Sequence, residues 1–233
     1  MNDISEPERF FPVKPSLNPT FENIMRSYIS KTVGTVLLLF LPLFAGATAL
    51  DQLKNFSANA HSARGEFSQA QVKSGEKVRF TNAASGTFLF SRPGKFIWTY
   101  KKPYEQVLQA DGTRLYMYDK DLNQVTVKKL GDALGSSPAA ILFGSNNLEK
   151  NFMLKNAGAH NGYEWVEVIP KKKDTPFEKI NIGMKNGIPE AMELYDSLGQ
   201  LTLIKFTQFT KNPPVNAGMF KFVAPKGADV FEN

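Results

Sequence analysis

Apolar and polar residues alternate with a period of two over much of residues 64–209, and short turn sequences interrupt the alternation. This alternation is typical of strands that bury one face, because successive side chains point to opposite sides of a strand. The dipeptides Asp111-Gly112, Asn161-Gly162 and Asn186-Gly187 indicate tight hairpins, which pair strands antiparallel. About eleven such strands are too many for a flat sheet, so we predict a sheet that curls into a partly closed barrel.

Two helices are predicted beside the strands. Apolar residues at 50, 53, 56 and 60 have helical spacing, and Ser137-Pro138 offers an N-cap followed by proline in the first turn. We place both helices over the mouth of the barrel, in a single domain of mainly β structure. The predicted strands are 64–72, 87–91, 95–100, 106–110, 115–119, 123–130, 152–155, 163–169, 177–184, 188–195 and 201–209, and a last β-like run covers 220–223.

The composition excludes several kinds of chemistry. Without cysteine the chain has no disulfide, no thiolate nucleophile, no iron–sulfur cluster and no cysteine-type zinc site. Its two histidines, His61 and His160, are expected on the surface, and no catalytic triad, P-loop or dinucleotide motif accompanies them. We therefore expect no enzyme activity, no metal and no cofactor. The net charge of +6 by itself suggests nucleic acid as a partner.

The N-terminal segment changes that interpretation. An apolar run of nine residues, Val36–Phe44, follows Arg26 and Lys31 and is followed by Ala47-Thr48-Ala49. The run is too short to span a bilayer as a helix, but the whole pattern is that of a cleavable secretory signal peptide, with cleavage after Ala49. An exported chain is not expected to meet nucleic acid.

We accordingly divide the chain into three parts. Residues 1–24 are polar and precede an ordinary signal peptide that begins at Met25, so we expect them to be a start-site extension. Residues 25–49 are the predicted signal peptide. Residues 50–233 are the predicted working domain, which contains no cysteine for lipid attachment.

Ten aromatic residues between Phe67 and Tyr118 lie mostly on the predicted strands. By the usual frequencies any one of them packs in an ordinary core. A curled, incompletely closed sheet with a wide aromatic interior also makes a ligand cavity. In an exported protein without an anchor, such a cavity suggests a carrier for a hydrophobic ligand.

Several motifs, in their order along the chain, resemble the LolA family, the periplasmic carriers of outer-membrane lipoproteins. They are Phe67-Ser68-Gln69, Arg92-Pro93, Phe96-Ile97-Trp98, Pro103, Asp111-Gly112, Tyr118-Asp119, Gln124-Val125-Thr126 and Phe220-Lys221-Phe222 with Pro225-Lys226-Gly227.

This resemblance implies an unclosed antiparallel β-barrel with a helical lid over a hydrophobic cavity. It implies a monomeric periplasmic chaperone without a cofactor. Its cargo would be triacylated lipoproteins, received from an inner-membrane ABC transporter and delivered to an outer-membrane lipoprotein receptor.

The resemblance also assigns roles to residues. Arg92 would be the lid latch, bonding to backbone carbonyls of the lid; from the residues alone, a rim arginine that points into water is an equal alternative. Phe67, Phe88, Phe90, Phe96 and Trp98 would line the cavity or, for the last two, the docking surface near its mouth. The lid candidates are Leu53, Phe56, Ile141, Leu142 and Phe143. Ordinary core packing is the alternative for all the apolar residues.

Other functions compete with this one. The lipid-anchored acceptor of the same fold needs a cysteine, which this chain lacks. An exported protein that binds small lipids, a non-catalytic envelope stress-sensing β-domain, an exported enzyme and a structural β-protein remain alternatives.

Overall fold

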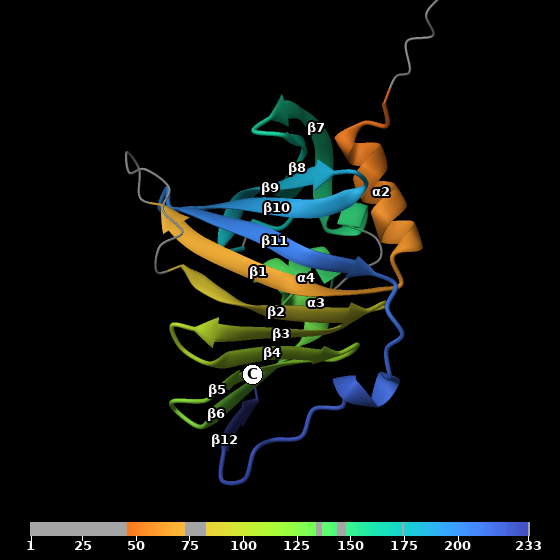
Figure 1. Ribbon diagram of the computed structural model, residues 1–233. Helices are drawn as coiled ribbons and strands as arrows, with labels where there is room; N and C mark the ends of the chain where they lie inside the picture. Colours follow the sequence, from red (N-terminus) through yellow and green to blue (C-terminus); the bar gives the residue numbers. More distant parts are fainter. Residues whose placement is uncertain (1–45, 73–82, 134–136, 144–147, 174, 233) are drawn as a thin grey trace, which may run out of the picture. The chain divides into compact units, whose positions relative to one another are not determined.

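The computed structural model describes residues 46–72, 83–133, 137–143, 148–173 and 175–232 (Figure 1). The predicted start-site extension and all but the last four residues of the predicted signal peptide lie outside this part. The twelve strands are β1 (Ser62–Val72), β2 (Ala84–Ser91), β3 (Lys95–Lys102), β4 (Gln106–Asp111), β5 (Arg114–Asp119), β6 (Gln124–Lys129), β7 (Phe152–His160), β8 (Tyr163–Pro170), β9 (Phe177–Lys185), β10 (Ile188–Asp196), β11 (Leu201–Lys211) and β12 (Asp229–Glu232).

All twelve strands belong to one sheet, in the order β12-β6-β5-β4-β3-β2-β1-β11-β10-β9-β8-β7. Two antiparallel meanders, β1 to β6 and β7 to β11, are joined because β1 pairs with β11. β12 and β7 form the two edges, so the sheet is not closed into a barrel. The predicted class, mainly β with an unclosed antiparallel sheet and few short helices, is confirmed.

In the described part of the chain, five short helices accompany the sheet: α2 (Ala49–Asn59), α3 (Leu130–Ala133), α4 (Pro138–Phe143) and the 3-10 helices η1 (Leu148–Lys150) and η2 (Ala217–Phe220). α2 contacts β7 to β10, α3 contacts β5 and β6, and α4 contacts β3. In Figure 1, α3 and α4 lie behind β1 and β2. Within the described ranges, none of the helices has the length and hydropathy needed to cross a membrane.

The helix starts follow from local capping. Thr48 caps α2, because its side chain accepts from the backbone N–H of Asp51 and the Asp51 carboxylate accepts from the Thr48 N–H. The Ser137 hydroxyl accepts from Ala140 N at 3.1 Å at the start of α4. α2 therefore begins at Ala49, one residue before the predicted mature N-terminus, and α4 forms where it was predicted.

The last β-like run of the sequence is not a strand. Phe220 ends η2 and is buried, and the ring of Phe222 stacks on Tyr116 at 4.5 Å. Their alternation reflects packing against the sheet without pairing, so the strand predicted over 220–223 is wrong. An unexpected strand, β12, follows instead and pairs parallel with β6.

Glycines allow two aromatic rings to lie across the neighbouring strands. Phe67 pairs with Gly86, and Phe88 pairs with Gly65. A Cβ atom on Gly65 would lie 2.7 Å from the Phe88 ring, and one on Gly86 would lie 1.8 Å from a β3 carbonyl oxygen. Only glycine fits at these positions without displacing the inner aromatic layer.

Candidate functional site

The inner face of the sheet is an aromatic layer. Neighbouring strands β1, β2 and β3 supply it, and the pairings of Phe88 with Trp98 and of Phe90 with Phe96 set its register. The Trp98 ring stacks on Phe67 at 4.0 Å and lies 6.2 Å from Phe88. All five residues predicted for the cavity thus lie together, with exposed fractions of 0% to 3%.

The helices fill the space in front of this layer. Phe143 at the end of α4 stacks on Phe90 at 4.4 Å and on Phe88 at 5.4 Å. Phe56 of α2 meets Phe90 edge-on at 6.3 Å. All the residues predicted for the lid are buried, with exposed fractions of at most 1%: Leu53, Phe56, Ile141, Leu142 and Phe143. Side chains of α2 and α4 therefore pack directly against the aromatic layer.

Arg92 connects both helices to the sheet, because it directly follows β2. Its Nε donates to the carbonyl of Ala60, the C-cap of α2, at 3.1 Å, and its Nη2 donates to the carbonyl of Leu142 in α4 at 3.3 Å. The guanidinium carbon lies 5.8 Å from the centre of the Phe56 ring and 5.1 Å from that of Phe90.

The chemistry of these acceptors suits a cation. Carbonyls at the C-terminal end of a helix lack helical partners and carry partial negative charge. Burial lowers the pKa of Arg92 to about 10, so the side chain remains protonated at neutral pH. The half-buried side chain is therefore directed at α2 and α4.

α2 is also held to the second meander by polar contacts. Gln52 donates from Nε2 to Glu164 Oε2 at 2.6 Å, and its Oε1 accepts from the backbone N–H of Gly187 at 3.0 Å. Lys54 Nζ forms an exposed ion pair with Glu149 Oε1 at 2.8 Å. These contacts tie α2 to β8, to the turn before β10 and to η1, whereas Arg92 is the point at which α2, α4 and β2 meet.

Two polar residues of the inner face were not predicted as part of the site. The Tyr100 hydroxyl donates to Gln69 Oε1 at 3.1 Å. The period-two alternation contained the signal for both, since Gln69 lies two residues after Phe67 and Tyr100 two residues after Trp98.

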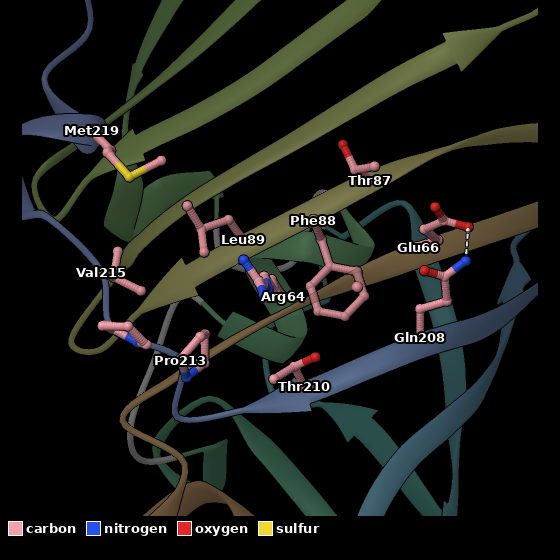
Figure 2. Close-up of a pocket in the computed structure, with 12 residues that line it drawn as sticks. Arg64, Glu66, Thr87, Phe88, Leu89, Gln208, Thr210, Pro213, Val215 and Met219 are labelled. Atoms are coloured by element: carbon pink, nitrogen blue, oxygen red, sulfur yellow. Dashed lines mark hydrogen bonds between the residues drawn. The ribbon is translucent and has the colours of Figure 1, made fainter.

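A groove of about 550 Å³ lies on the opposite, outer face of the sheet (Figure 2). Its floor includes Arg64 and Leu89, and Val215 and Met219 of the C-terminal segment form part of its wall. Glu66 lies at one end, where Figure 2 shows its hydrogen bond from Gln208, 3.2 Å long. Charged and amide groups make this groove a poorer site for an alkyl chain than the inner face.

In the described part of the chain, residues of the types used in catalysis and metal binding do not converge. His61 and His160 are exposed, and the His160 ring stacks on Trp165 at 4.9 Å. Asp119 accepts from the Leu122 N–H at 3.1 Å, as expected of a turn aspartate. Among the described residues, no group of three histidines, aspartates or glutamates could hold a metal ion.

Comparison with known proteins gives consistent matches. Residues 58–223 match the family model described as "Outer membrane lipoprotein carrier protein LolA". The outer-membrane lipoprotein carrier protein of Cupriavidus taiwanensis is 57% identical over 210 residues, covering 89% of this chain and 100% of that protein. The carrier protein of Dechloromonas aromatica is 46% identical over 203 residues, covering 87% and 96%. An uncharacterized conserved protein from Thermus thermophilus shares the fold, with a TM-score of 0.50 at 11% identity, covering 79% of this chain and 96% of that chain.

Proposed function

The chain belongs to the LolA family of outer membrane lipoprotein carrier proteins, and we propose that its inner aromatic face binds the acyl chains of lipoproteins. The observation that carries the proposal is Arg92, which hydrogen-bonds α2 and α4 over a fully buried aromatic layer. Breaking two hydrogen bonds at one side chain would release both helices from the end of β2, so the interior can exchange lid side chains for cargo.

The energetics favour such an exchange. Each buried methylene contributes roughly 0.8 kcal/mol, so an acyl chain with about fifteen methylenes gains roughly 12 kcal/mol on leaving water. Exposing a buried Phe or Leu side chain costs about 1.5–3 kcal/mol. Cargo can therefore displace Phe143 and its neighbours, while their tendency to return weakens the binding enough for release.

We place Arg92 as the latch of the closed form, with Leu53, Phe56, Ile141, Leu142 and Phe143 as the lid. Support comes from its contacts with both helices and from the cations' preference for helix C-terminal carbonyls. The cavity residues are Phe67, Phe88, Phe90, Phe96 and Trp98, whose stacked rings offer a continuous apolar surface.

The protein would work in the periplasm as a non-enzymatic, monomeric chaperone. Residues 25–49 would direct export and be removed after Ala49, with Met25 as the start. Triacylated lipoproteins would arrive from an inner-membrane ABC transporter and leave to an outer-membrane receptor. The names of the relatives and the pattern of the leader sequence support this placement.

The test uses the chain from Gly46, purified in detergent, delipidated and freed of detergent. It is incubated with a triacylated lipoprotein, and with the same lipoprotein lacking its acylated cysteine as the control. We expect a soluble complex in size-exclusion chromatography with the acylated form only. Aggregation of the lipoprotein regardless of the carrier, or equal binding of the control, would contradict the proposal.

A further inference from the structure

The inner aromatic layer contains a polar hydrogen without an acceptor. Trp98 is 1% exposed, and within the described part of the chain its Nε1–H has no hydrogen-bond partner. Buried donors almost always have partners, because leaving water without one is costly. A donor of this kind in a binding interior indicates a group that arrives with the ligand.

Trp98 lies beside two other polar groups of this layer. Its ring centre is 6.2 Å from that of Tyr100, whose hydroxyl bonds to Gln69. Burial raises the pKa of Tyr100 and the Trp98 side chain partly lowers it, so the two side chains are neighbours, although no hydrogen bond joins the indole N–H to the phenol oxygen. The orphan donor thus belongs to a polar end of an otherwise apolar layer.

This polar end is opposite the latch. β1 and β2 pair antiparallel, with Gln69 across from Ala84 and Ser62 across from Ser91, the residue before Arg92. Tyr100 pairs with Gly86, near the Gln69 end. Phe90 and Phe96, which pair with each other, lie between Trp98 and Arg92. The layer is therefore polar at the Gln69 end and purely aromatic toward Arg92.

We propose that Trp98 Nε1–H is a specificity-determining donor that binds a carbonyl oxygen of the ester or amide linking an acyl chain to the cargo. This inference rests on the proposed function and deepens it. The linkage carbonyl is the only strong acceptor on a fatty-acyl group, so a buried donor distinguishes an acyl chain from an alkyl chain of equal length. The alkyl part then extends over the aromatic rings toward Arg92.

The experiment compares two synthetic lipopeptides with the same peptide and chain lengths. One carries two ester-linked palmitoyl chains, and the other carries two ether-linked hexadecyl chains, which lack the carbonyls. Dissociation constants are measured for the chain from Gly46. Because one neutral hydrogen bond changes affinity by about three- to tenfold, we expect the ester form to bind about three- to tenfold more tightly.

Trp98→Phe keeps an aromatic ring but lacks the N–H, and its ester-to-ether affinity ratio should fall to about one. Trp165→Phe is the matched control. Trp165 is also buried, but its Nε1 donates to the His160 carbonyl at 3.1 Å, and its variant should keep the wild-type ratio.

Equal affinities of the wild-type protein for the two lipopeptides would overturn the inference, even if Trp98→Phe does not fold. An undiminished ratio in a folded Trp98→Phe would also overturn it. If the wild-type protein binds neither lipopeptide, the proposed function itself fails, and the inference fails with it.

Discussion

Replacing Arg92 by leucine should weaken lid closure and tighten cargo binding. In the closed form the guanidinium donates to the carbonyls of Ala60 and Leu142 at 3.1 and 3.3 Å and lies over two phenylalanine rings. Leucine makes none of these polar contacts. The substitution destabilises the open form less than the closed form, because in the open form the two helices no longer present their carbonyls to residue 92.

The size of the effect follows from competition between lid and cargo. A hydrogen bond from a charged group contributes about 1.5–3 kcal/mol, and two are lost, but the cost of burying the charge is also removed. A net loss of about 1.5–3 kcal/mol from the closed form corresponds to about 10- to 150-fold in the closed-to-open equilibrium. If the closed form dominates without cargo, the apparent dissociation constant for a triacylated lipopeptide falls by the same factor.

The assay measures this dissociation constant and the rate at which the lipopeptide passes from the carrier to lipid vesicles. Arg92→Leu should bind more tightly and release more slowly. Arg64→Leu is the matched control, because the Arg64 side chain is exposed in the outer groove and has no hydrogen-bond or ion-pair partner among the described residues. Unchanged or weaker binding by Arg92→Leu, or an equal gain in Arg64→Leu, would refute the latch.

Two further predictions concern stability. Gly86→Ala should lower the melting temperature strongly, because the added Cβ would lie 1.8 Å from a β3 carbonyl oxygen. Gly131→Ala is the control and should leave the melting temperature unchanged, because its Cβ would meet nothing within 4 Å. Equal melting temperatures of the two variants would contradict the close approach at Gly86. A chain that begins at Leu50 lacks the Thr48 cap of α2. Because a cap contributes about 1 kcal/mol, its melting temperature in calorimetry should be about 2–4 °C lower than that of a chain that begins at Gly46. An unchanged melting temperature would show that the cap is dispensable.

The hairpins are the part of the fold that short-range sequence patterns predict best. Asn161-Gly162 and Asn186-Gly187 adopt the predicted tight turns, with φ of 53° and 79° in the first pair and 52° and 74° in the second. Asparagine and glycine are the residues that tolerate this left-handed region, so the turns are encoded locally. The strands between them then pair in sequence order, which is why both meanders could be predicted.

The C-terminal segment shows where such patterns fail. Phe220-Lys221-Phe222 alternates as a strand does, but its two rings pack against the sheet without backbone pairing. β12 has only four residues, and all of them are exposed. It pairs with β6, which lies about a hundred residues earlier in the sequence. No local pattern distinguishes packing on a sheet from pairing within it.

By itself, the sequence determined most of the strand and turn pattern, the aromatic face, and the residue types of the proposed apolar binding site and its proposed latch. Only the tertiary structure decided which groups meet: that the guanidinium of Arg92 reaches the Ala60 and Leu142 carbonyls, and that the indole N–H of Trp98 stays without an acceptor among the described residues. The reason is physical. Alternation is a property of neighbouring residues, whereas hydrogen-bond partners depend on how β1, β2, β3 and two distant helices pack together.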